Sequence, residues 1–304
     1  MTDAADECRS PATSLRFRDP RLQVDFERDG FVVGPDLDRH AMDELRALWD
    51  EIGPSKVSGI WSNVHVLGPE TNRAVDHAIT EAFRPLVDQV MDNGRLAGAS
   101  FLVKGVGPGS ASEPHQDWNN VDERSALSLS MWCPLVDVDE RNGALQVLPG
   151  THRLRHTVRS LDTGSLTLGF DDELRPRLRS LPVPAGRCVF YAHNLFHGSL
   201  PNDGDRIRVA VTSGVLPRGV RHLHYRRGEG DTFEELEVER EFFLSGIPEL
   251  VGGGLPGSAR VAGVVTVPGG PLTRDEVLGP PGAGGAGAAR SKWRRWRRDK
   301  RGVS

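Results

Sequence analysis

The sequence predicts a mostly β protein, a sandwich or jelly roll with helices packed outside it. From residue 100 onward, short runs rich in Val, Leu, Phe and Thr alternate with turns of Gly, Pro, Asn and Asp. No helical crossovers separate these runs at regular intervals, which disfavours a parallel, doubly wound sheet. The first hundred residues instead carry helical patterns, so we expect these helices to flank the sheets.

The elements expected before residue 100 begin after a flexible lead-in over residues 1–20. A short strand is expected over Gly30–Val33, and Asp36 or Asp38 could cap the helix that follows it. An apolar stripe at helical spacing marks that helix, made of Met42, Leu45, Leu48 and Ile52. A second helix is expected over Asn72–Met91.

The strands are expected in five apolar runs, at residues 100–106, 125–138, 144–150, 187–199 and 207–216. Residues 233–243 are compatible with a helix or with a strand–helix junction. Together these elements predict one domain over residues 21–278. Residues 279–304 begin with a Gly, Ala and Pro linker and end in a basic segment, which predicts a flexible, disordered tail.

Charge is distributed unevenly along the chain. The formal net charge is −4, yet seven Lys or Arg and one Asp lie between Ser291 and Ser304, so the rest of the chain is acidic. An acidic body is a poor non-specific ligand for nucleic acid. The basic tail, which includes two tryptophans, could bind nucleic acid or an anionic membrane, but a solubilising tail is the simpler interpretation.

Composition also indicates the compartment. The N-terminal sequence is acidic and polar, unlike a signal peptide, and no apolar run is long enough to span a bilayer. The three cysteines, Cys8, Cys133 and Cys188, lack metal-ligand spacing. We therefore expect a cytoplasmic protein without a membrane span, either a monomer or a homodimer.

A His-x-Asp triplet carries the functional signal. His115 and Asp117 are expected on one face of a strand, and His197 follows in a later turn. Two imidazoles and one carboxylate suit a non-haem Fe(II) with open positions for oxygen and an organic co-substrate. On the last strand, Arg208 shares a face with Thr212, from where its planar fork would bind a carboxylate.

Other histidines and a glycine-bearing segment are less informative. His193 and His197 have the spacing of a helical zinc site, but their segment is typical of a strand and a turn, so we assign His193 a structural role. His222 and His224 alternate on an expected strand, as a surface face or a substrate-side contact. Residues 105–114 lack the Lys-Ser/Thr ending of a phosphate loop and are interpreted as a turn.

From Phe26 to about Leu216 the chain resembles the phytanoyl-CoA dioxygenase family of Fe(II)/2-oxoglutarate-dependent oxygenases. The matching motifs occur in order: FERDGFVV at 26–33, HQD at 115–117, MWCPLVDVDERNGALQVLPGTHR at 131–153 and HGSLPNDGDRIR at 197–208. The resemblance implies a double-stranded β-helix fold and the use of Fe(II), 2-oxoglutarate and O2, with release of succinate and CO2.

The resemblance also implies residue roles. His115, Asp117 and His197 would be the catalytic iron ligands, and Arg208 would bind the distal carboxylate of 2-oxoglutarate. Further contacts to the co-substrate are implied for Ser199, Trp132 and, as a supporting residue, Gln116. Because related halogenases lack the carboxylate, Asp117 favours hydroxylation, or a desaturation or cyclisation variant, over halogenation.

The substrate side is predicted from position alone. Expected substrate contacts follow the iron-binding strand or lie between the two helices: Trp118, Asn119, Asn120, Glu123, Trp61 and Asn63. Their polar character suggests an amine, an amino acid or a hydroxylated molecule, while the family also acts on acyl groups and secondary metabolites. The substrate is therefore expected to be a small molecule of unspecified class.

Two competing functions remain open. A zinc or manganese jelly-roll enzyme could use the same three ligands for hydrolysis or isomerisation, and a non-catalytic module could use the pocket to bind a metal or ligand. Arg208 discriminates against the first, because such enzymes need no clamp for a dicarboxylate. An intact ligand set argues against the second.

Overall fold

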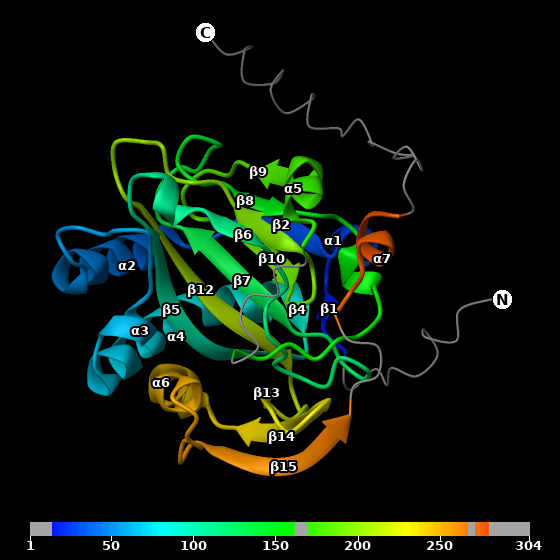
Figure 1. The fold of residues 1–304 in the computed structure, drawn as a ribbon. Coiled ribbons are helices and arrows are strands. Elements are labelled where there is room, and N and C mark those ends of the chain that lie inside the picture. Colours follow the sequence, from blue (N-terminus) through cyan, green and yellow to red (C-terminus); the bar gives the residue numbers. More distant parts are fainter. Residues whose placement is uncertain (1–13, 162–168, 267–270, 280–304) are drawn as a thin grey trace, which may run out of the picture.

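The core of the protein consists of two antiparallel sheets, with the N-terminal helices outside them (Figure 1). A computed structural model describes residues 14–161, 169–266 and 271–279. The larger sheet has the spatial order β2 (Phe31–Asp36), β10 (Arg187–Ala192), β7 (Leu129–Pro134), β12 (Arg208–Pro217), β5 (Gly94–Lys104) and β3 (Ile60–Trp61). The smaller sheet has the order β6 (Ser112–His115), β11 (His197–Ser199), β8 (Leu145–Val147) and β9 (Arg179–Leu181). This arrangement confirms the jelly-roll prediction.

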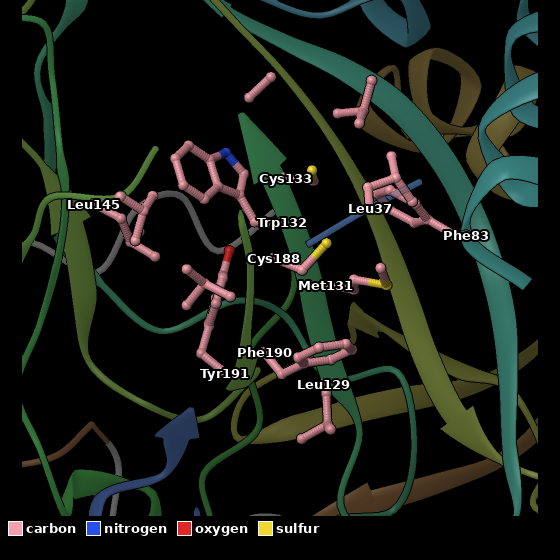
Figure 2. Packing of buried hydrophobic residues seen from close by; sticks show 14 of the residues in the cluster. Leu37, Phe83, Leu129, Met131, Trp132, Cys133, Leu145, Cys188, Phe190 and Tyr191 are labelled. Carbon is pink, nitrogen blue, oxygen red and sulfur yellow. The ribbon is translucent and has the colours of Figure 1, made fainter. Parts of the chain in front are cut away.

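The central strands of the larger sheet form the core. Every residue of β7 is buried, and its apolar side chains pack beside those of β10 (Figure 2). Cys133 and Cys188 lie in this cluster as free, buried thiols. A strand buried on both faces has a continuous rather than alternating apolar pattern. Such a pattern does not mark the ends of the strand, so the run at 125–138 predicted a strand longer than β7.

The N-terminal part is more ordered than expected. Arg16 and Phe17 form β1, which pairs with β4 (Met91–Asp92), so the flexible lead-in does not extend to residue 20. Helix α1 (Pro20–Asp29), which the apolar pattern did not predict, follows directly. Asp19 accepts a hydrogen bond from the backbone N–H of Arg21 at its start, and Gly30 ends it with a φ of 78°.

The two predicted helices are present. In α2 (Arg39–Ile52), Asp38 accepts hydrogen bonds from the backbone N–H groups of His40 and Ala41, so Asp38 and not Asp36 is the cap. Helix α4 (Pro69–Val90) begins three residues earlier than expected, because Pro69 suits the first turn. The short helix α3 (Asn63–Val66) lies between them.

A third, three-stranded sheet lies beneath the sandwich in Figure 1. It is formed by β13 (Leu223–Arg227), β14 (Thr232–Val238) and β15 (Ala259–Thr266). A π-helix (Phe242–Gly246) and α6 (Ile247–Val251) follow β14, which confirms the strand–helix junction. The helices α5 (Asp171–Leu174) and α7 (Arg274–Leu278) complete the described chain, and the expected tail lies almost wholly outside it. None of the described helices has the length and apolar character needed to span a bilayer.

Candidate metal centre

The structure brings His115, Asp117 and His197 together. His115 ends β6 and is paired in register with His197 at the start of β11, and their ring centroids are 4.3 Å apart. The Nε2 atoms of His115 and His197 lie 3.6 Å and 3.5 Å from Asp117 Oδ1. One ligand atom from each residue lies within 4.8 Å of the other two, a spacing that would accommodate a metal ion.

Backbone contacts orient both imidazole rings. Nδ1 of His115 lies 2.7 Å from the carbonyl oxygen of Glu113, and Nδ1 of His197 lies 2.9 Å from that of Leu195. Because a carbonyl only accepts, each Nδ1 carries the proton and each Nε2 offers a lone pair to the centre. Second contacts of this kind fix the tautomer and the orientation of metal-binding histidines.

Asp117 lies just beyond β6, and not on the strand as expected. Its backbone N–H donates to the carbonyl of His193 at 2.8 Å, and its Oδ2 accepts from the Ser130 hydroxyl at 3.3 Å. Burial alone would raise the pKa of Asp117, but His197 and His115 hold it well below its usual range. Burial lowers the pKa of His197 to about 4. Burial also opposes protonation of His115, but its contact with the Asp117 carboxylate outweighs burial and raises the pKa of His115. Metal binding would therefore have to displace a proton from His115, whereas Asp117 and His197 are already in the forms that bind a metal.

The three side chains line a cavity of about 310 Å³ between the two sheets. The expected co-substrate residues Arg208, Trp132 and Ser199 line the same cavity. Gln116 does not, since its amide donates to the carbonyl of Asn194, behind the metal ligands.

Arg208 is the most unusual group in this cavity. Its side chain is buried, with 2% of its surface exposed, and its guanidinium carbon lies 5.3 Å from the centre of the Trp132 ring. Nε and Nη1 have no hydrogen-bond partner. Burial lowers the pKa of Arg208 to about 10, so the group stays charged at neutral pH. A buried, unpartnered guanidinium is costly unless an anion binds it.

The expected substrate residues divide into two groups. Trp118 and Asn120 line the cavity. The other four, Asn119, Glu123, Trp61 and Asn63, lie outside its lining. Trp61 packs against Trp49, with ring centroids 5.3 Å apart. The amide of Asn63 is buried, where it donates to Asn72 and accepts from the backbone N–H of Phe101, so it anchors α3.

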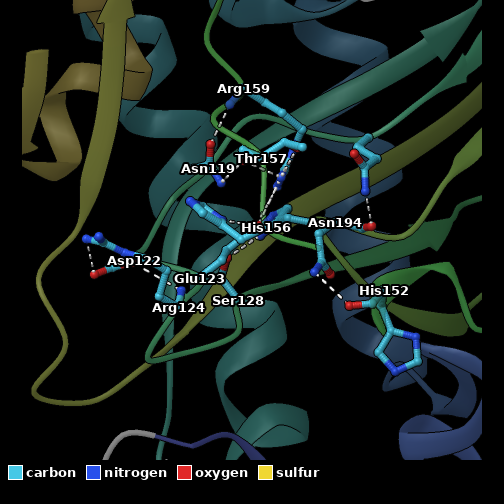
Figure 3. Close-up of polar contacts among 12 residues, drawn as sticks. Asn119, Asp122, Glu123, Arg124, Ser128, His152, His156, Thr157, Arg159 and Asn194 are labelled. Carbon is cyan, nitrogen blue, oxygen red and sulfur yellow. Dashed lines mark hydrogen bonds and ion pairs between the residues drawn. The ribbon is translucent and has the colours of Figure 1, made fainter. Parts of the chain in front are cut away.

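Asn119 and Glu123 belong to a buried network centred on Arg159 (Figure 3). Arg159 pairs with Glu123 through both of its terminal nitrogens, and its backbone N–H donates to Asn119 Oδ1 at 2.6 Å. Its Nε donates to the carbonyl oxygen of Asp117 at 2.6 Å. The acidic and amide groups that suggested an amine substrate therefore support the metal-site loop from behind.

The histidine assignments need one correction. His193 is buried as expected, with Nδ1 2.7 Å from the Ser128 hydroxyl, although it also borders the cavity. His222 and His224 do not form a surface face, because both are buried. His222 stacks on Phe243 at 4.7 Å, and His224 packs against Phe242 at 5.3 Å.

Several cavity residues were missed in the sequence. Lys104, Tyr191 and Phe243 all line the cavity. Lys104 lies in an apolar run directly before a turn. A lysine inside an apolar run indicates a buried charged group, and this signal could have identified Lys104 as a cavity residue. Tyr191 and Phe243 lie in apolar segments whose inward and outward faces the sequence alone does not distinguish.

Residues 26–210 match the family model of phytanoyl-CoA dioxygenase (PhyH), which covers more than half of the chain. The chain belongs to this family. Membership makes it an iron- and 2-oxoglutarate-dependent enzyme and confirms the family resemblance. None of the curated proteins matches the chain significantly.

The chain also matches solved structures at low identity and with TM-scores below 0.5. The α-ketoglutarate-dependent epimerase SnoN of nogalamycin biosynthesis is 21% identical over 66% of this chain and 84% of its own, with a TM-score of 0.47. AviO1 from Streptomyces viridochromogenes Tue57 is 20% identical over 66% of this chain and 95% of its own, with a TM-score of 0.48. EctD from S. alaskensis, with 2-oxoglutarate and 5-hydroxyectoine, is 21% identical over 67% and 77%, with a TM-score of 0.46.

The residues of this PhyH protein fit the cofactors that the family implies. The donor set of two Nε2 atoms and one carboxylate is the one expected for Fe(II) with open coordination positions. The unpartnered nitrogens of Arg208 in the same cavity match the distal carboxylate of 2-oxoglutarate.

Proposed function

We propose that this protein hydroxylates a small molecule while 2-oxoglutarate is converted to succinate and CO2. The observation that carries the proposal is the shared cavity, which holds both the three-residue donor set and the unpartnered guanidinium of Arg208. An enzyme that used the metal only for hydrolysis or isomerisation would not need a buried, unpartnered guanidinium to bind a carboxylate. The carboxylate of Asp117 supports hydroxylation over halogenation, because it fills the third protein position.

In this proposal His115, Asp117 and His197 hold the iron, and Arg208 binds the distal carboxylate of 2-oxoglutarate. Iron with 2-oxoglutarate and O2 supplies an oxidant that can remove hydrogen from an unactivated C–H bond. The protein contributes binding, orientation and exclusion of water. The Glu113 and Leu195 carbonyls hold the two imidazoles in one orientation, and Ser130 holds the free oxygen of Asp117.

The apolar walls of the cavity support the same role. Trp132 lies over the Arg208 guanidinium and shields it from water, which strengthens its interaction with a carboxylate. Ser199 borders this end and offers a hydroxyl donor. Tyr191 packs against His197, with ring centroids 4.6 Å apart, and limits the movement of that imidazole.

An anaerobic titration tests the proposal. Protein given Fe(II) and 2-oxoglutarate should develop the visible charge-transfer band of a chelated keto acid, and admission of O2 should yield succinate. The Asp117→Ala variant should lose both signals. Asp122→Ala is the matched control, because Asp122 lies in the same loop but contacts Arg124 instead of the centre. Absence of both band and succinate in the unaltered protein would contradict the proposal.

A further inference from the structure

The cavity has a charged end and an uncharged end. Strands β5 and β12 are paired along it, with Lys104 opposite Arg208 at one end and Ala97 opposite Gly214 at the other. The seven residue steps from Ala97 to Lys104 correspond to about 23 Å along a strand. The register of these two strands therefore separates the co-substrate end of the cavity from the end left for substrate.

Fixed charges gather at the co-substrate end and at the metal ligands. Apart from histidines, the charged side chains among the described lining residues are Lys104, Arg208 and Asp117. Lys104 is 1% exposed, and its ammonium group donates to the backbone carbonyls of Ser110 and Leu200. Burial and the neighbouring charge of Arg208 lower the pKa of Lys104 to about 7. A carboxylate bound by Arg208 would therefore favour the charged form of Lys104 and stabilise this end.

The opposite end is built from small, uncharged residues: Ala97, Gly98, Ala99 and Gly214, with the hydroxyl of Ser213 beside them. A side chain at Gly98 would meet the Cβ of Phe243 at 3.0 Å, so the phenyl group of the π-helix closes directly over the strand. Ile247, Val64 and Trp118 also line the cavity. His222 stacks on Phe243 with an interplanar angle of 12°. Burial lowers the pKa of His222 to about 3, so the imidazole that packs against Phe243 is uncharged at neutral pH.

Asn120 supplies a fixed polar group beside this apolar end. Its Oδ1 lies 3.4 Å from Nε2 of His222, and its Nδ2 lies 3.4 Å from the ring nitrogens of His193. These two contacts hold the amide in one orientation, and a remaining N–H of Nδ2 can bind one acceptor on a ligand.

We propose that the substrate is an uncharged, mainly apolar small molecule that carries a hydrogen-bond acceptor for Asn120. This inference rests on the proposed function and specifies the substrate class for the same site. An ionic group placed between Phe243, Ile247 and Val64 would lose its hydration without gaining a partner, whereas an apolar ring or chain gains contact area. The proposal replaces the amine or amino-acid substrate suggested by the loop sequence.

A charge series on one apolar skeleton tests the substrate class. The probes are 1-naphthalenemethanol, 1-naphthylmethylammonium and 1-naphthoate, each titrated anaerobically into full-length protein saturated with Fe(II) and 2-oxoglutarate. Saturation keeps the carboxylate probe away from Arg208. Binding is followed by equilibrium dialysis. The neutral alcohol should bind at least tenfold more tightly than either ion. Equal or tighter binding of either ion would overturn the proposal.

A pair of substitutions on α3 tests the location. Val64 lines the cavity, whereas Val66 on the same short helix is 57% exposed and outside the lining. Val64→Asp should weaken binding of 1-naphthalenemethanol at least tenfold, and Val66→Asp should leave it unchanged. Equal effects of the two variants would contradict the assigned location. The charge-transfer band reports separately on the proposed function, and its loss in unaltered protein would contradict that function instead.

Discussion

Arg208 shows how one residue can indicate the chemistry of the ligand that a cavity binds. Its strand context places it in the interior, where its charge is retained but two of its nitrogens, Nε and Nη1, have no hydrogen-bond partner. A guanidinium presents its donors in a rigid fork that matches a carboxylate, which an ammonium group does not. The unsatisfied donors, more than the residue type, support the proposal that Arg208 binds the distal carboxylate of 2-oxoglutarate.

Substitution of Arg208 should therefore act on one end of the co-substrate. Arg208→Ala is expected to weaken 2-oxoglutarate binding by on the order of 2–5 kcal/mol, the cost of losing a buried charged pair. Arg208→Lys should recover only part of this energy because it lacks the fork. The measurement is an anaerobic titration of the charge-transfer band. The control ligand is 2-oxopentanoate, which lacks the distal carboxylate and should bind equally to all three proteins. Equal weakening of both ligands would show that Arg208 does not contact the distal carboxylate.

The loop that follows β6 shows what an element adds to its residues. Residues 116–125 carry the proposed metal ligand Asp117, two further cavity residues and the acid that pairs with Arg159. This arginine contacts the loop at three points (Figure 3). His156 Nδ1 lies 3.5 Å from the same Glu123 carboxylate. A buried network in which the charged groups of Arg159 and Glu123 are paired makes a loop rigid.

We expect Arg159 to act as a positioning residue for the metal site. Arg159→Met should lower the affinity for Mn(II), followed by EPR, by about 10–100-fold, as is typical when a group behind a metal ligand is lost. Arg240→Met is the matched control, because Arg240 pairs with the buried Asp76 at 2.6 Å but does not contact the metal ligands. It should lower thermal stability without changing Mn(II) affinity. A similar loss of Mn(II) affinity in both variants would indicate general destabilisation instead.

The same elements show how far the sequence predicted the structure. Apolar periodicity identified α2, α4 and the main strands, because burial on one face leaves a repeat. It missed α1, whose first signal is the cap Asp19 with Pro20 and whose interior has one buried residue, Phe26. Pairing of β6 with β11 brings His115 and His197 together, and a backbone hydrogen bond to His193 places Asp117 beside them. In the loop, Asn120 lines the cavity, whereas the neighbouring Asn119 accepts a hydrogen bond from the backbone N–H of Arg159. The sequence could not predict this difference, because it depends on a residue forty positions later in the chain.

At the scale of the whole molecule, buried neutral histidines should limit acid stability. The pKa of His222 is lowered from 6.5 to about 3, chiefly by burial, so only the unfolded chain binds this proton between these pH values. The free energy of unfolding should therefore fall as the pH drops from 6.5 towards 3. His222→Phe should flatten this fall, measured as the urea midpoint at several pH values. An unchanged pH profile would show that His222 is not the group responsible.

The position of the site across both sheets has a thermodynamic consequence. His115 and His197 belong to the smaller sheet, whereas Arg208, Trp132 and Ser130 belong to the larger one. A ligand bound to both groups exists only while the sheets are packed together, so occupancy and folding are linked. At a 2-oxoglutarate concentration 100 times its dissociation constant, stability should increase by about 2.7 kcal/mol. Differential scanning calorimetry of metal-loaded protein measures this gain, and a melting temperature independent of 2-oxoglutarate would contradict the linkage. For this fold, supply of its co-substrate would then set the lifetime of the protein as well as its turnover.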